Sequence, residues 1–186
     1  MMNAFAKIRF FFILSLVGAT LFSCDPNEEL PPELILEYLG CQHFGDSTGV
    51  TALKLQVRFK KGDGNLGIDP HETGKGKFVG KYENNLFVQV FDRVSLTDTI
   101  YEPMTNPNSE TGEDEDIVFK FTVPVVSESR TASVKGTIDF IVEGFDFTNG
   151  VKRDSKHGIV RFQIYMYDRD LNQSNTVTTI PDIRIR

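Results

Sequence analysis

The chain has 186 residues, with 26 acidic and 20 basic side chains and a formal net charge of −6 at pH 7. A surface of this sign repels nucleic acid and anionic lipid headgroups, so the composition argues against a polyanion as the partner. Sixteen Phe and no Trp indicate a β-rich core and lack the tryptophan on which sugar-stacking surfaces usually depend.

The N-terminus has the pattern of an exported protein. Lys7 and Arg9 precede an apolar stretch, residues 10–17, that is too short to span a bilayer. Residues 21–24, Leu-Phe-Ser-Cys, resemble a bacterial lipobox, in which the cysteine becomes the new N-terminus and carries lipid such as palmitate. We therefore expect residues 1–23 to be a lipoprotein signal peptide and Cys24 to be lipidated. An ordinary signal peptide with an incidental cysteine is the alternative.

An acidic segment that contains proline, residues 24–33, follows as a tether. Loss of Lys7 and Arg9 with the signal peptide leaves 18 basic against 26 acidic residues, a net charge of −8 for the mature chain. The remaining residues, 34–186, are enough for one domain with a single core.

Cys41 is the one cysteine left in this domain, so an internal disulfide is excluded. Strand alternation would place Cys41 and His43 on one face, which is the minimum for an activated nucleophile. No oxyanion device or orienting acid accompanies them in the sequence. A buried, inert cysteine is therefore the favoured interpretation over a catalytic one.

Short alternating segments separated by polar turns run through the domain. The clearest strand is 53–59, where Leu53, Leu55, Val57 and Phe59 alternate with polar residues. Other strands are expected at 34–38, 86–91, 97–101, 117–123, 134–142, 159–167, 176–179 and 183–185. Polar turns or loops are expected at 45–49, 102–116, 127–131 and 146–155, and no segment has a helical apolar stripe.

Seven or eight short strands of this kind predict an all-β fold, an antiparallel Ig-like or fibronectin-III-like β-sandwich. An eight-stranded barrel is the alternative. The paired cysteines and core Trp of a true immunoglobulin domain are absent, so Ig-like describes the architecture only. The expected core contains Leu55, Val57, Phe119, Phe121, Ile138, Phe140, Phe162 and Ile164.

The glycines Gly62, Gly64 and Gly67 match the spacing of a dinucleotide-binding fingerprint. That fingerprint requires a helix directly after it, whose N-terminus binds the pyrophosphate. Asp69 and Pro70 follow instead, so we reject a nucleotide cofactor.

Oxygen-bearing side chains gather in two loops. If the strands at 53–59 and 159–167 run in the same direction, the loops that follow them meet at one end of the sandwich. The side chains concerned are Asp63, Asn65, Asp69, Asp168, Asp170 and Asn172. Oxygen donors of this type are those that Ca²⁺ prefers, so a calcium site is one hypothesis. Ordinary turn chemistry, or neutralisation by Arg169, is the alternative.

Two loop motifs and the lipobox together carry a family resemblance. Residues 62–67 read Gly-Asp-Gly-Asn-Leu-Gly, and residues 168–175 read Asp-Arg-Asp-Leu-Asn-Gln-Ser-Asn. With the lipobox at Cys24, the chain resembles the Ig-like envelope lipoproteins of Bacteroidetes-type bacteria. The resemblance implies a lipoprotein of the outer membrane, with surface exposure suggested by the acidic residues behind Cys24, and implies no activity.

Catalysis has little support in the sequence. His43, His71 and His157 lie in separate contexts without a catalytic signature. We therefore expect no enzyme but a binding or adhesion module, held at the membrane by its lipid, with an envelope protein or a surface glycan as partner. An accessory structural subunit of an envelope complex is the alternative. Exposed Tyr165 and Tyr167 beside an apolar patch would favour docking of a protein.

Overall fold

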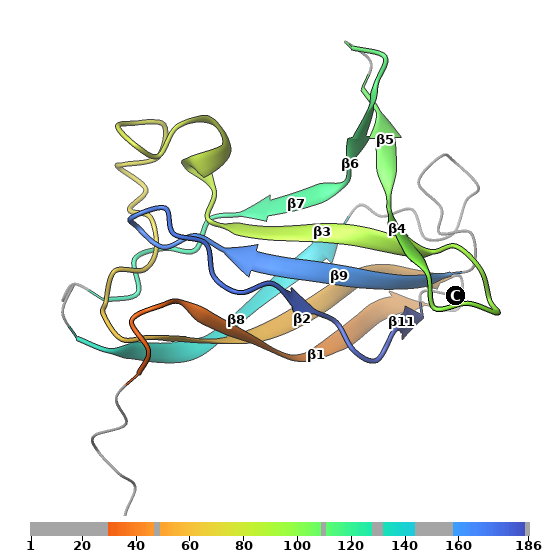
Figure 1. Ribbon diagram of the computed structural model, residues 1–186, viewed down its shortest axis with the longest axis horizontal. Coiled ribbons are helices and arrows are strands. Elements are labelled where there is room, and N and C mark those ends of the chain that lie inside the picture. Colours follow the sequence, from red (N-terminus) through yellow and green to blue (C-terminus); the bar gives the residue numbers. More distant parts are fainter. Residues whose placement is uncertain (1–29, 47–48, 109–110, 128–131, 144–157, 185–186) are drawn as a thin grey trace, which may run out of the picture.

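The computed structural model describes residues 30–46, 49–108, 111–127, 132–143 and 158–184 (Figure 1). Several sequence expectations lie outside these residues. They are the signal peptide, Cys24, the loop at 146–155, His157 and most of the turn at 127–131.

Three long strands form the first sheet. They are β1 (Ile35–Asp46), β2 (Gly49–Lys61) and β8 (Val134–Glu143), in the order β1-β2-β8, and both pairings are antiparallel.

The second sheet is built around two central strands, β3 (Leu86–Arg93) and β9 (Ile159–Met166), which pair antiparallel. Short strands β10 (Val177–Thr178) and β11 (Ile183–Arg184) pair with β9. On the opposite edge of β3 lie β4 (Tyr101–Pro103) and β7 (Val118–Phe121). A separate hairpin of β5 (Thr105–Pro107) and β6 (Asp114–Asp116) projects beside β7 (Figure 1).

The described residues thus form an all-β structure of antiparallel sheets, as expected. The one helical element among them is the 3₁₀ turn η2 (Gly80–Glu83). The two main sheets are separate, so the barrel alternative is wrong. Eleven strands are present within the described ranges rather than seven or eight. The additional strands are short, and β5 and β6 lie in a segment that was expected to be a loop.

One core lies between the two sheets. The inward residues of β2 and those of β9 are buried, which confirms the alternation in both strands. Leu55, Val57, Phe140, Phe162 and Ile164 are buried as expected. Phe119, Phe121 and Ile138 pack against this core but stay partly exposed. All three lie on β7 or β8, which are edge strands of their sheets.

The expectation of a strand at 97–101 is wrong. Only Tyr101 belongs to a strand, and residues 94–100 form a loop. Side chains satisfy this loop's backbone: Arg93 donates to the carbonyls of Leu96 and Asp98, and Ser95 Oγ accepts from the amide of Thr97. These bonds replace the neighbouring strand that a sheet would have supplied.

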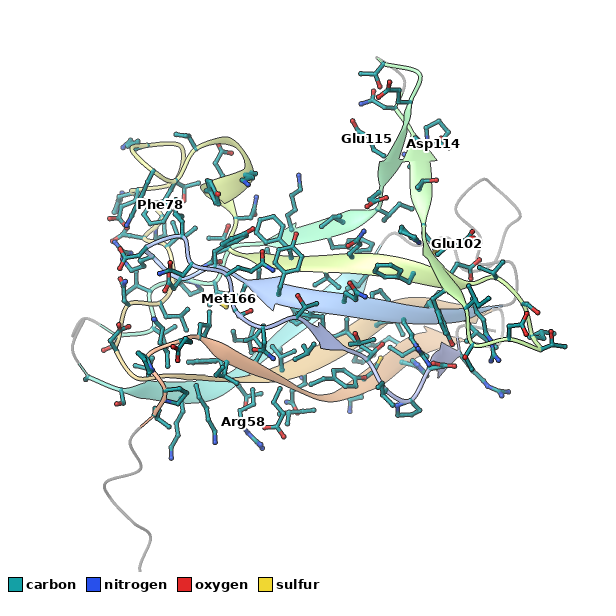
Figure 2. All side chains as sticks on the ribbon, in the orientation of Figure 1. Arg58, Phe78, Glu102, Asp114, Glu115 and Met166 are labelled. Carbon is teal, nitrogen blue, oxygen red and sulfur yellow. The ribbon has the colours of Figure 1, made fainter. Side chains whose placement is uncertain are left out.

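The polar connection at 102–116 is also more ordered than expected, because it contains β4, β5 and β6. Asp114 and Glu115 of its acidic run lie on the projecting hairpin (Figure 2). Asn108 Nδ2 donates to Glu115 Oε1 at 2.6 Å, which ties the two arms together. At the other end of the chain, β1 extends far beyond the expected 34–38, since it pairs with β2 along its length across two bulges.

Candidate functional site

The loops that follow β2 and β9 meet at one end of the sandwich, as the calcium hypothesis required. Asn65 Nδ2 donates to Asp170 Oδ2 at 2.5 Å, and the amide of Arg169 donates to the carbonyl of Asn65 at 3.1 Å. We call this end, with residues 62–78 and 168–173, the loop end; it lies at the left in Figure 1.

Lys61, the last residue of β2, supplies the cation of the loop end. Its side chain is 4 % exposed, and Nζ lies 3.2 Å from both Asp63 Oδ1 and Asp168 Oδ2. The same ammonium donates to the carbonyl oxygen of Pro32 at 2.9 Å. Lys61 was not among the expected site residues, although it continues the buried phase of 53, 55, 57 and 59. A lysine at the next buried position of an alternating strand is a sequence signal from which this site residue could have been identified.

The predicted calcium ligands are already bonded by the protein. Asp168 Oδ1 accepts the amides of Asp170 and Asn172 at 2.8 and 2.9 Å, and Asn172 Nδ2 donates to the same carboxylate. Asp63 Oδ1 accepts the amide of Asn65 at 3.1 Å. These are Asx-type turn bonds, which supports the turn-chemistry alternative.

Asp170 lies at the rim of the loop end. Its Oδ1 is 3.1 Å from Lys77 Nζ, and this hydrogen bond lowers the pKa of the carboxyl below its ordinary value. Asp69 takes part in a different set of bonds. Its carboxylate accepts the amide of His71, and its amide donates to Glu72.

Arg169 forms an ion pair with Glu72, which is not one of the six residues of the expected cluster. Its Nη2 lies 2.7 Å from Glu72 Oε1, Nη1 donates to the carbonyl of Gly67, and the guanidinium lies over the ring of Phe78. The described residues contain no group of three or more His, Cys, Asp or Glu side chains that could hold a metal. The calcium site stays a prediction.

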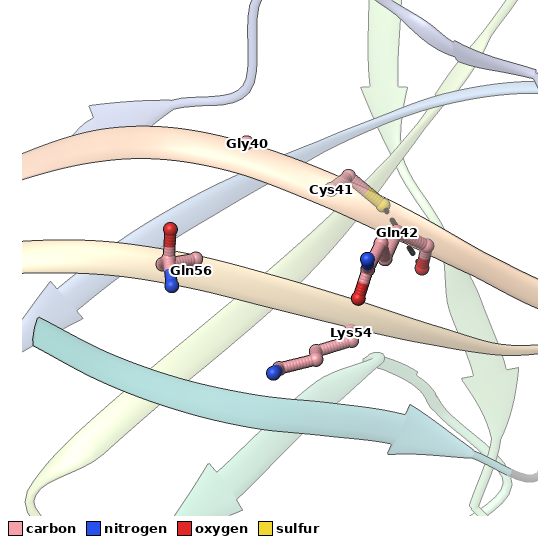
Figure 3. A pocket seen from close by; sticks show the side chains of 5 residues that line it. All are labelled: Gly40, Cys41, Gln42, Lys54 and Gln56. Atoms are coloured by element: carbon pink, nitrogen blue, oxygen red, sulfur yellow. Dashed lines mark hydrogen bonds between the residues drawn. The ribbon is translucent and has the colours of Figure 1, made fainter.

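Cys41 lines a shallow depression on the first sheet (Figure 3). The depression has a volume of about 310 Å³ and is lined by Gly40, Cys41, Gln42, Lys54 and Gln56. Burial raises the pKa of the Cys41 thiol to about 11, and Sγ donates weakly to the Gln42 carbonyl at 3.7 Å. A thiol that stays protonated at neutral pH is a poor nucleophile, which favours the inert interpretation.

Tyr165 and Tyr167 lie on the outer face of the second sheet, and other aromatic rings cover much of each. The rings of Phe87 and Tyr165 stack at 5.2 Å, and Tyr167 meets Tyr82 of η2 edge-on at 5.4 Å. Lys81 Nζ lies 4.7 Å from the centre of the Tyr82 ring. This cluster fixes η2 to the sheet, so the two tyrosines do not form an open docking patch.

The most exposed large apolar side chains of the described residues lie instead on two separate segments toward the end opposite the loop end. Ile180, Leu96 and Ile100 are 70 %, 63 % and 58 % exposed, the highest values among large apolar side chains in the described ranges. We call these three residues the apolar tip. Phe78 and Glu102, labelled in Figure 2, lie near the loop end and the tip end respectively.

A polar network holds the segments of the apolar tip together. Asp182 Oδ1 lies 2.6 Å from Arg161 Nε, and Asp182 Oδ2 accepts the hydroxyl of Tyr101 at 2.5 Å and lies 3.9 Å from Arg93 Nη1. Arg93 in turn holds the 94–100 loop. Burial raises the pKa of Asp182, but the two hydrogen bonds and the arginine charges outweigh it and hold this pKa below its ordinary value. The tip is therefore a supported surface rather than two independent loops.

The fold and these sites define an all-β domain with a clustered loop end and an apolar tip. Comparison with protein-family models, curated proteins and solved structures gave no match. Among the described residues, no helix has the length and apolar character needed to cross a membrane.

Proposed function

We propose that this chain is an envelope lipoprotein, anchored in the outer membrane by lipid on Cys24, that presents a non-catalytic Ig-like binding module. The lipobox and the acidic tether support the anchoring. A three-stranded sheet packed against a larger antiparallel sheet supports the Ig-like architecture.

The apolar tip is the observation that carries the binding role. The three most exposed aliphatic side chains of the described residues lie on two segments that the Asp182 network links at one end of the domain. We infer that a partner covers them. Leu96, Ile100 and Ile180 lie on loops supported by a rigid scaffold, which is where binding residues are commonly found. A protein partner with an apolar recess fits this surface better than a surface glycan, because the tip offers aliphatic groups rather than open aromatic faces.

Two variants test this function in the native envelope. Cys24→Ser should release the protein from membranes, because the acyl chains contribute about 0.8 kcal/mol per buried CH₂ and no other described segment is apolar enough to replace them. Full retention of that variant in lipid vesicles without other proteins would refute the anchoring.

The tip itself is tested by Leu96→Ser combined with Ile100→Ser. Affinity capture of envelope neighbours should lose at least one specific protein in this variant. The matched control is Ile141→Ser, an aliphatic residue 44 % exposed on the first sheet, and it should retain that protein. Equal capture by both variants would refute docking through the tip.

An accessory subunit of an envelope complex is the second candidate, and β8 favours it. Among the described residues, β8 pairs only with β2, so one side of a ten-residue strand has no strand neighbour. A strand edge without a strand neighbour can accept a strand from another protein. Substitution of Thr137 by Pro would block such an addition, and loss of complex assembly with normal tip binding would favour this candidate.

A further inference from the structure

The start of the described chain is held firmly by the loop end. The amide of Gly62 donates to the carbonyl of Pro31 at 2.6 Å, and Lys61 Nζ donates to the carbonyl of Pro32 at 2.9 Å. Two residues later the chain enters the core, where Leu34 and Leu36 are buried. Residues 30–32 are therefore part of the folded domain. We call them the anchor segment.

The close contact between Gly62 and the anchor segment leaves no room for a side chain at this position. A Cβ atom at this position would lie 2.6 Å from the carbonyl oxygen of Leu30 and 2.9 Å from that of Pro31, both closer than packing allows. Gly62 is not among the glycines with a positive φ, so its backbone does not require glycine. The position needs glycine because the anchor segment lies directly against it.

Lys61 joins the anchor segment to both loops. Its ammonium contacts the Pro32 carbonyl, Asp63 in the loop after β2 and Asp168 in the loop after β9. Ser133 adds a further bond, from Oγ to the carbonyl of Gly62, just before β8 begins. The anchor segment is therefore connected, through Lys61 and Gly62, to the ends of strands in both sheets.

We propose that Lys61 and Gly62 form a latch for the anchor segment, which holds the loop end toward the anchoring membrane and turns the apolar tip away from it. This inference rests on the proposed lipidation of Cys24. Six residue steps separate Cys24 from Leu30, and an extended chain of that length spans at most about 20 Å. The strands that separate the loop end from the 94–100 loop of the tip are longer, since the eight residues of β3 extend about 26 Å.

The latch gives the domain a defined orientation with respect to the membrane. With the anchor segment bound, the loop end stays within the short reach of the tether, and the tip is offered to proteins beyond the membrane surface. With the anchor segment released, its three residues would lengthen the free tether. The domain would then be able to turn, and the tip would also reach the bilayer.

Gly62→Ala tests the latch, because the added Cβ displaces the anchor segment and leaves Lys61, Asp63 and Asp168 unchanged. Hydrogen exchange on the full-length protein should show at least tenfold faster exchange in residues 30–36. Residues 159–166 of β9 should exchange at the wild-type rate, which verifies the fold. Gly40→Ala is the matched control, because a Cβ there meets nothing within 4 Å. Wild-type exchange in residues 30–36 of Gly62→Ala would overturn the latch.

Lys61→Met is the second variant, because it removes the other arm of the latch and leaves Gly62 unchanged. It should also speed exchange in residues 30–36 relative to residues 159–166 of β9, by less than Gly62→Ala if the Pro31 bond persists. Unchanged exchange in this variant would remove Lys61 from the latch.

Energy transfer then tests the orientation. A fluorophore is attached through Leu96→Cys, and an acceptor lipid is placed in vesicles that carry the lipoprotein. Transfer should be low in the otherwise wild-type protein and clearly higher with Gly62→Ala. Equal transfer in both, with faster exchange in Gly62→Ala, would overturn the orienting role. The exchange measurement does not require a lipid. Failure of the protein to bind vesicles would therefore refute the proposed anchoring without changing the outcome of the exchange test of the latch.

Discussion

Lys61 Nζ lies 3.2 Å from Asp168 Oδ2, and the two side chains are 4 % and 3 % exposed. Lys61 ends β2 in the first sheet, and Asp168 follows β9 in the second, so this ion pair joins the two layers at the loop end. Asp63 shares the same ammonium. A buried charge pair of this kind adds little net stability as a whole, but removal of one partner leaves the other charge uncompensated.

Lys61→Met should therefore destabilise the domain by about 3–5 kcal/mol, because Asp168 would stay buried without its cation. Urea unfolding followed by circular dichroism measures the change. Lys54→Met is the control, since the Lys54–Asp139 pair is substantially exposed and should contribute less than about 1 kcal/mol. Similar decreases in the free energy of unfolding in the two variants would show that the Lys61 pair contributes no more to stability than an exposed pair.

Calcium should not change the melting temperature of the wild-type protein, because the Lys61 ammonium already lies between Asp63 and Asp168. Lys61→Met lacks that ammonium, and Ca²⁺ should raise its melting temperature. An ion at 100 times its dissociation constant would add about 2.7 kcal/mol. The measurement is thermal unfolding in millimolar calcium and then in chelator. A wild-type response that disappears in Asp63→Ala with Asp168→Ala would instead establish the calcium site expected from the sequence.

Cys41 should react slowly with iodoacetamide at pH 7. Burial raises the pKa of this thiol from 9.0 to about 11, which lowers the thiolate fraction at neutral pH by about a hundredfold. Mass spectrometry of the Cys24→Ser protein isolates the reaction at Cys41. The rate should rise in urea, where the thiol regains its ordinary pKa. Fast alkylation of the folded protein would restore the case for a reactive cysteine.

The Asp182 network should make the tip end sensitive to acid. The pKa of Asp182 in the folded state is below its ordinary value of 3.8, so its ion pairs stabilise the protein fully above that pH. This contribution is lost as the pH falls through the lower folded-state value. Asp182→Asn should therefore be less stable than wild type at pH 7, and the difference should shrink below about pH 4.

Urea unfolding at several pH values measures this difference. Asp98→Asn is the control, because Asp98 joins the network through its backbone carbonyl alone. A stability difference between Asp182→Asn and wild type that does not change with pH would contradict the ionic role of Asp182.

The local pattern of the sequence was sufficient for the long strands and their buried faces. Period-two alternation in 53–59, 134–142 and 159–167 predicted β2, β8 and β9, because each strand faces the core on one side only. The Asx-type bonds in the loops after β2 and β9 agree with the turn-chemistry alternative to the calcium site. The short strands β4, β5 and β6 were missed, because segments of three residues carry too little alternation to be recognised.

The tertiary structure decided which charges meet and which apolar groups remain uncovered. Asn65 and Asp170 bond across 105 positions of sequence, and the counter-ion of Asp168 is a lysine that ends a strand of the other sheet. Leu96, Ile100 and Ile180 are ordinary aliphatic residues in the sequence, and only the network at Asp182 brings their loops together. Alternation is a property of neighbours along one strand, whereas ion pairs and exposure depend on how separate strands are placed, so the site residues followed from packing and the fold class from pattern.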